Sequence, residues 1–443
     1  MDAVGDHLFS QEYDRNYKDI FIVQSEVAQT IANEIEVAIT PKEKELIEKI
    51  PTTDLTAHDY YQRGKDEYGK YKSDRNNREA LNRAEELYHK ALEYDSTFAL
   101  SYVGLANVYW NKQYYEDFFS ESFLDSCIVL INKALSFDDQ LDEAYLLKGE
   151  YYQETGQLNE ALFQYDRAIK INPNYFRAYH KKGIVLTMFE HDFVKGIDNY
   201  NKALNLIRGD EYAILLRQIG LSYLNVGFTE KAEKYYKEAY ALDSNKAMYL
   251  SNLSFLEFSL ENFEEALILQ KQTHEIDSIG LQQMMIYNVA SGHKEEAYEL
   301  AQKYVEFYEL SGALALQDAF QIGYAFWQVG KYKEAEDYFM QQIEIGEASI
   351  KLNRNIAQWG AAHHDLASTY AFLGDKVKAY QYLDELNELN FFPLYWVSYA
   401  KHNPLINSIR NEERYQKFLE NMEAKHQAEH ERVRMWLEEN DML

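Results

Sequence analysis

Apolar and small residues recur along most of the chain at spacings of three and four positions, the period of an amphipathic helix. The stretch 141–175 shows the pattern most clearly. Gly149 and Ala161 are small enough to let two helices pack closely. Gly156 suits the turn between them because glycine tolerates a positive φ, and Pro173 ends the second helix. This stretch therefore predicts a helix, a turn and a second helix.

The same pattern recurs about nine times between Ala57 and Asn390, most specifically in the third and fifth copies. The sixth and seventh copies are weaker, which indicates a bend or a break there. One helix pair cannot bury its apolar face alone, so neighbouring pairs must stack. We therefore expect an all-α fold, a right-handed superhelix (an α-solenoid) of about nine helix pairs over residues 57–390.

The skeleton of the third copy resembles the tetratricopeptide repeat (TPR), with Tyr145 for the usual Trp and Lys148 for the usual Leu. The matching residues are Tyr152, Gly149, Gly156, Ala161, Tyr165, Ala168 and Pro173. The resemblance implies a binding scaffold whose first helices line a concave groove. In the version that grips a terminal carboxylate, a lysine stands where this chain has Val103, so that ligand is not expected.

The two ends of the chain depart from the repeat pattern. Alternation over 7–15 predicts a short strand, and apolar spacing over 18–39 predicts a helix, so residues 1–50 are interpreted as the remnant of a preceding α/β domain. Residues 391–443 predict an irregular segment with Pro393 and Pro404, followed by a capping helix over 412–440.

The opening is also similar to a bacterial module in which a small α/β domain runs into TPR repeats. The words that carry this likeness are Tyr13-Asp14-Arg15, Lys18-Asp19-Ile20-Phe21 and Gln24-Ser25-Glu26-Val27-Ala28. In that module the repeats follow a DNA-binding domain of the AraC or winged-helix type, or an adenylate cyclase domain. The resemblance implies that the chain is the C-terminal part of a larger bacterial regulator.

Composition narrows the classes of partner. Asp and Glu number 73 against 45 Lys and Arg, a formal net charge of −28, which argues against nucleic-acid binding by this chain and favours cationic or neutral partners. The lone Cys127 excludes an intrachain disulfide and suits packing. No apolar run is long enough to be a membrane segment. We expect a cytoplasmic protein or, alternatively, the periplasmic domain of a membrane-attached regulator.

Two polar clusters contain residues that could carry chemistry. His426 and His430 fit the His-x-x-Glu-His spacing of one zinc protease class, but a charged final helix favours a surface role over a casual metal site or a protease. His363 in His363-His364-Asp365 faces the partner helix and is better read as a packed histidine. No phosphate loop or Gly-x-Ser-x-Gly elbow is present. We expect no enzyme, no metal and no cofactor.

The groove is the better candidate site. Residues between the skeleton positions of the first helices should point into it, and Trp110 and Trp327 fall at the same place in their copies. The candidate binding residues are Asn107, Trp110, Asn111, Arg177, His180, Arg217, Phe255, Tyr324 and Trp327. They could grip an extended peptide or helix, stack on a sugar, or pack one repeat against the next.

The leading interpretation is a non-enzymatic interaction or sensory domain that binds a protein, peptide or small ligand in this groove. The alternative is a self-association module that sets the oligomeric state of an attached DNA-binding or cyclase domain. In that alternative the final helix or the N-terminal strand would form a homodimer, because an unpaired strand edge needs a partner.

Overall fold

A computed structural model describes residues 48–75, 77–112, 123–207, 211–277, 280–311, 319–351 and 360–443, with isolated positions 26, 27, 30, 44 and 357. Within these ranges the chain is helical and contains no strand. The predicted strand over 7–15 and most of the predicted helix over 18–39 lie outside the described residues.

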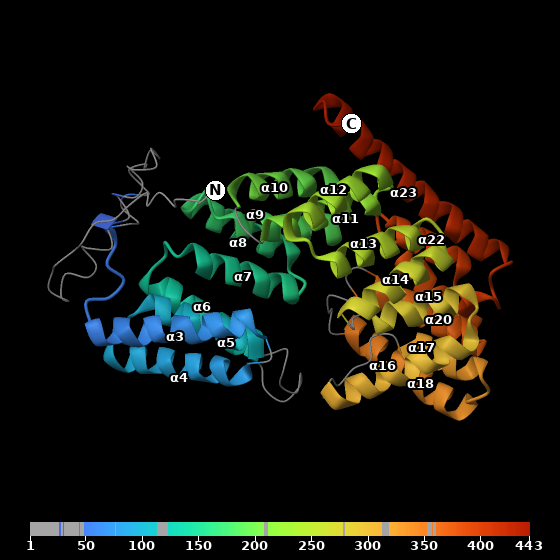
Figure 1. The fold of residues 1–443 in the computed structure, drawn as a ribbon, viewed down its shortest axis with the longest axis horizontal. Helices are drawn as coiled ribbons and strands as arrows, with labels where there is room; N and C mark the ends of the chain where they lie inside the picture. Colours follow the sequence, from blue (N-terminus) through green and yellow to red (C-terminus); the bar gives the residue numbers. More distant parts are fainter. Residues whose placement is uncertain are drawn as a thin grey trace, which may run out of the picture. The chain divides into compact units, whose positions relative to one another are not determined.

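Nine helix pairs follow one another through the described part of the chain, and they correspond to the nine predicted repeats (Figure 1). Repeats 1 to 5 are α3 (Leu55–Ser73) and α4 (Arg78–Tyr94), α5 (Ala99–Lys112) and α6 (Phe123–Phe137), α7 (Asp142–Glu154) and α8 (Leu158–Ile171), α9 (Phe176–Met188) and α10 (Phe193–Leu206), and α11 (Glu211–Asn225) and α12 (Thr229–Asp243). Repeats 6 to 9 are α13 (Lys246–Ser259) and α14 (Phe263–Asp277), α15 (Leu281–Ser291) and α16 (Lys294–Ser311), α17 (Ala319–Gln328) and α18 (Tyr332–Lys351), and α20 (Ala361–Leu373) and α21 (Lys376–Leu386). This confirms the predicted all-α solenoid of helix pairs.

A C-terminal segment follows the ninth pair. It contains α22 (Leu394–His402), the short 3-10 helix η2 (Pro404–Ile406) and the long final helix α23 (Glu413–Glu439). The predicted irregular stretch therefore contains a helix of its own, and the predicted final helix agrees with α23 to within a residue at each end.

Contacts divide the chain into two compact units, Met1–Leu147 (unit 1) and Lys148–Leu443 (unit 2), and each is described by itself. The break that the weak sixth and seventh copies indicated is not seen at those repeats. Instead, helices α13 to α16 pack on their neighbours without interruption inside unit 2. The physical reason is that the C-terminal segment ties repeats 4 to 9 together, through contacts described below.

Tyrosines fill the space that small residues leave between the two helices of a pair. A Cβ atom added at Gly149 would lie 2.4 Å from the Tyr165 ring, and one at Gly183 would lie 2.5 Å from the Tyr200 ring. Both rings are fully buried or nearly so. Many of the 38 tyrosines are thus core residues, as the repeat skeleton predicts.

The turn between the two helices of a pair repeats with one residue at positive φ. This residue stands five positions before the small residue of the second helix, and in repeats 3 to 9 it is Gly156, His191, Gly227, Glu261, Gly292, Gly330 or Gly374. Positive φ is unfavourable for residues with a Cβ atom. His191 (φ 54°) and Glu261 (φ 66°) are therefore the two exceptions in this series, and both contact the C-terminal segment.

Candidate interaction sites

A polar row runs across the first helices of unit 1. The half-buried Asn107 on α5 donates from Nδ2 to Oε1 of Glu143 at 3.0 Å. One turn later, Asn111 donates to the hydroxyl of Tyr68 on α3 at 3.0 Å, and its Oδ1 accepts from Arg75 at 2.6 Å. Hydroxyl, amide and carboxylate groups from α3, α5 and α7 thus meet on one face, together with the Arg75 guanidinium from the turn after α3. Such a set can donate to and accept from a peptide backbone.

Trp110 lies on the same helix, and one side of its ring has a packing role. Its half-buried ring packs against the cluster formed by α5 and α6, which includes Ile131 and Cys127. The Cys127 thiol is fully buried and donates to the Ala106 carbonyl at 3.4 Å. The predicted packing role of this cysteine is confirmed.

Two predicted groove arginines in unit 2 form ion pairs between elements. Arg177 on α9 pairs with Glu211 on α11, with 3.1 Å between Nη2 and Oε1. Arg217 on α11 pairs with Asp243 at the end of α12. These pairs link repeat 4 to repeat 5 and the two helices of repeat 5.

His180 lies beside the Tyr200 ring, with 5.9 Å between the ring centroids. Burial lowers its pKa to about 4, and the charges of Lys181 and Arg177 act in the same direction. Its buried Nε2 has no hydrogen-bond partner among the described residues. The ring is therefore neutral at physiological pH.

In the middle of unit 2 the chain's own α22 covers the first helices, packing against α11 and α13. It also meets α20 through the rings of Trp396 and His364. The Phe255 ring packs on Tyr395, with 5.1 Å between centroids. Ser398 donates to the Ser259 carbonyl at 2.6 Å, and Gln321 donates to the hydroxyl of Tyr399 at 3.1 Å. The part of the predicted groove that contains Phe255 is thus filled by the C-terminal segment.

The last two predicted residues lie near the turn between α17 and α18. Tyr324 is buried and stacks on Trp327, with 6.0 Å between centroids. Trp327 is 42% exposed and also packs edge-on against Phe372 of α20, 5.1 Å away. Of the nine predicted residues, the structure thus brings Asn107 and Asn111 into one network and joins Tyr324 to Trp327. Trp110 and Trp327 belong to different units.

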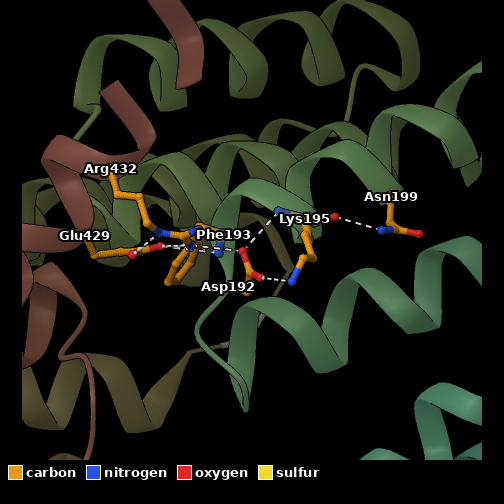
Figure 2. A network of polar contacts seen from close by, with 6 residues as sticks. All are labelled: Asp192, Phe193, Lys195, Asn199, Glu429 and Arg432. Atoms are coloured by element: carbon orange, nitrogen blue, oxygen red, sulfur yellow. Dashed lines mark hydrogen bonds and ion pairs between the residues drawn. The ribbon is translucent and has the colours of Figure 1, made fainter. Parts of the chain in front are cut away.

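The final helix α23 forms a long-range contact that the sequence did not predict (Figure 2). Arg432 pairs with Asp192, which caps α10, at 2.9 Å and with Glu429 at 2.7 Å. Glu429 also accepts from the Phe193 backbone N–H at 3.4 Å, and Lys195 completes the network through Asp192. Burial acts to raise the pKa of Asp192, but its hydrogen bonds with Lys195 and Arg432 outweigh that effect and hold the pKa below its ordinary value.

The histidines of the His-x-x-Glu-His word belong to the same contact. Nδ1 of His426 lies 3.0 Å from the Phe392 carbonyl oxygen, and Nδ1 of His430 lies 2.7 Å from that of Val226. The His430 ring stacks on Phe228 with 4.3 Å between centroids. Both side chains are half-buried against the array rather than fully solvated, because α23 docks on the turns of repeats 4 and 5. In the described part of the chain, no group of three or more His, Cys, Asp or Glu residues could hold a metal ion.

A second tie joins α22 to the turn of repeat 6. His402 Nε2 lies 2.9 Å from the Glu261 carboxylate, and Lys401 lies 3.6 Å from it. The His402 ring meets the Phe263 ring edge-on at 5.1 Å. One sequence feature could have pointed to α23 as a bridge, because the apolar residues of its two ends are separated by a polar middle.

The other histidine cluster is also internal to unit 2. His363 lies 3.5 Å from Glu385 and is half-buried. His364 Nδ1 lies 3.0 Å from Asp365, whose pKa is raised by burial. The arrangement supports the packed interpretation of His363.

The helix pairs match known repeat models. A TPR repeat model matches residues 149–188, and a tetratricopeptide repeat model matches residues 217–246 and 319–348. These matches identify the helix pairs that they cover as tetratricopeptide repeats, as the third copy predicts. Stacked pairs of this kind define the α-solenoid class of fold.

Two curated relatives share part of the chain. A protein named as adenylate cyclase 3 of Rhizobium meliloti is 32% identical over 104 residues, which is 24% of this chain and 17% of that protein. A TPR repeat-containing protein of Methanocaldococcus jannaschii is 25% identical over 232 residues, 52% of this chain and 35% of that protein. The chain thus spans about a sixth and a third of the lengths of these relatives.

Solved structures with similar folds include a tetratricopeptide repeat protein from Parabacteroides merdae, with 14% identity, a TM-score of 0.44, and coverage of 64% of this chain and all of that one. YrrB, described as a TPR protein with an unusual peptide-binding site, has 20% identity, a TM-score of 0.32, and coverage of 43% and 92%.

Through the residues that the structure describes, no helix has both the length and the apolar character needed to cross a bilayer.

Proposed function

We propose that the chain is a non-enzymatic interaction domain that binds a protein or peptide on the first-helix face of unit 1. The observation that carries the proposal is the hydrogen-bonded row of Tyr68, Arg75, Asn107, Asn111 and Glu143. An amide carries both a donor and an acceptor, as the alternating groups of an extended backbone do. Asn111 is buried and bonded within the row, so the half-buried Asn107 is the amide that a partner would meet. The net charge of −28 and the exposed Glu143 favour a neutral or cationic segment.

The preference for unit 1 rests on the contrast with unit 2. There, α22 packs against the first helices and takes up Phe255, Gln321 and the Ser259 carbonyl. A partner could reach this part of unit 2 only by displacing α22 and its hydrogen bonds. In this interpretation residues 57–390 form the array, and residues 391–443 close it by folding back.

The experiment that tests this proposal begins with peptides selected from a random dodecapeptide library by their binding to the immobilised full chain. Isothermal titration calorimetry then compares their binding to the wild type, to Asn107→Ala, and to Asn82→Ala on the exposed face of the second helix α4. We expect Asn107→Ala to weaken binding about tenfold, the loss of roughly one hydrogen bond, and Asn82→Ala to leave it unchanged. Equal affinities for all three proteins would contradict the proposed site.

We further propose that the domain is the sensory part of a larger bacterial regulator. Support comes from the likeness of residues 13–28 to the module described above and from the partial match to a protein named as an adenylate cyclase. An immunoblot of source cells with an antibody against this chain tests the idea. A band well above 52.2 kDa is expected, and a single band at 52.2 kDa would refute it.

The self-association alternative has less support. One of its two candidate surfaces was the final helix, but Tyr415, Phe418, Met422, Val433 and Leu437 of α23 are all buried within unit 2. The other, the predicted strand over 7–15, lies outside the described residues. Light scattering on the full chain at several concentrations separates the two functions. A mass that stays at 52.2 kDa fits the interaction domain, whereas a stable dimer would favour the alternative.

A further inference from the structure

Three repeats of unit 2 carry an aromatic residue at the same place, three positions before the small residue of the second helix. These are Phe193 in repeat 4, Phe263 in repeat 6 and Tyr332 in repeat 8. The equivalence is structural, because each follows a turn whose positive-φ residue stands two positions earlier: His191, Glu261 or Gly330. All three aromatics therefore sit at the same edge of their helix pairs.

The C-terminal segment covers the first two of these aromatics. Phe193 is 1% exposed and meets the Phe391 ring edge-on at 4.9 Å. Phe263 meets the His402 ring edge-on at 5.1 Å. In both places an acidic turn residue pairs with a basic one of the segment, Asp192 with Arg432 and Glu261 with Lys401.

The third aromatic is left uncovered. Tyr332 is 63% exposed, and its neighbour Trp327 is 42% exposed, with 6.1 Å between the two ring centroids. Trp327 also meets Phe372 of the next repeat. Leu373 and Val377, at the turn of that repeat, are 46% and 82% exposed. Large apolar side chains that gather on a surface mark interaction sites.

The charge at this edge is opposite to that of the two covered edges. Lys331 occupies the position that Asp192 has in repeat 4, and Lys333 follows Tyr332. Both lysines are exposed, and neither forms an ion pair among the described residues. A basic side chain such as Arg432 or Lys401, which pairs with Asp192 or Glu261, would be repelled here, since like charges brought together at an interface are unfavourable.

We propose that Trp327, Lys331, Tyr332, Lys333, Leu373 and Val377 form a docking patch for an acidic segment of a partner protein that carries an aromatic residue. The ring of that residue would pack on Tyr332 and Trp327, as Phe391 packs on Phe193. Its carboxylates would pair with Lys331 and Lys333. The patch is on unit 2 and does not depend on the polar row of unit 1.

The test uses the full chain and a fluorescein-labelled dodecapeptide in which one tryptophan and one phenylalanine are flanked by aspartate and glutamate. Fluorescence anisotropy compares it with two control peptides, one with lysine in place of every acidic residue and one with alanine in place of both aromatics. The acidic aromatic peptide is expected to bind at least about tenfold more tightly than either control. Equal binding of the lysine peptide would overturn the proposal.

Variants locate the binding on the chain. Lys331→Glu/Lys333→Glu should weaken the acidic peptide about tenfold or more, and Tyr332→Ala should weaken it without changing the charge. Lys271→Glu/Lys303→Glu, at exposed positions of α14 and α16, carries the same charge change and should leave the affinity within about twofold. An equal loss of affinity for the acidic peptide in both double variants would overturn the proposed site. A dimer of the wild type that dissociates in Tyr332→Ala would also overturn it, because the patch would then bind a second copy of this chain.

Discussion

Leu437 offers a sharp test of how α23 is held. Its side chain is fully buried in a cluster with Val433, Phe193 and Tyr223, so it anchors the second half of the helix on repeats 4 and 5. Leu437→Ala removes this anchor and leaves a cavity, and comparable core truncations cost about 3 kcal/mol. That loss should raise the population of an undocked second half about 150-fold.

The first half of α23 should behave differently, because it is held in a separate cluster. Tyr415, Phe418 and Met422 are buried there against the last repeat. Hydrogen exchange followed by mass spectrometry can measure both halves in one experiment, since exchange reports the free energy of local opening. We expect Leu437→Ala to accelerate exchange over 429–439 about 100-fold and to leave 415–424 nearly unchanged.

Met435→Ala is the matched control, because that side chain is on the same turn of the helix and is 51% exposed. It should change exchange in neither half by more than about twofold. If Leu437→Ala accelerated both halves equally, α23 would open as one unit and the division into two anchors would be wrong. No change over 429–439 would show that the helix does not depend on this packing.

Two further predictions concern the array and the pH dependence of its closure. In α3, Gly64→Ala should lower the free energy of unfolding by about 1–3 kcal/mol, because the new Cβ would lie 2.8 Å from the Tyr88 ring. Gly69→Ala has open space around it and should raise the free energy of unfolding by about 0.5–1 kcal/mol. Urea unfolding of both variants checks the two signs. Burial lowers the pKa of His191 to about 4, so the folded protein favours the neutral ring. This contribution to stability is fully present above pH 6.5 and is lost as the pH falls towards 4. At pH 5.5 the loss is about 1.4 kcal/mol. Exchange protection of 429–439, corrected for the intrinsic rate at each pH, should therefore fall with pH in the wild type and fall less steeply in His191→Asn. Asparagine is chosen because it tolerates positive φ. Parallel pH profiles of the two proteins would show that another group is responsible.

The site was harder to predict than the fold. Asn107 and Asn111 were found from their spacing on one helix, and they do share a network. The same spacing predicts that Arg177 and Arg217 face a ligand, and that stays a prediction; the structure adds their ion pairs with Glu211 and Asp243, which the spacing did not predict. The spacing of residues along a helix predicts the direction of a side chain but not its partner. The partner lies on a neighbouring helix, and the local sequence pattern does not predict how that helix is rotated about its axis.

The sequence by itself determined the nine helix pairs, their turns and the tyrosine packing within repeats 1, 3, 4 and 5. These depend on contacts between residues close in the sequence, such as Gly149 with Tyr165, so a local pattern can encode them. Only the tertiary structure decided what His426, His430 and Arg432 do. Arg432 meets Asp192, 240 positions earlier. That contact exists because small rotations accumulate from repeat to repeat and bring the turn of repeat 4 within reach of α23, and no single repeat contains this information.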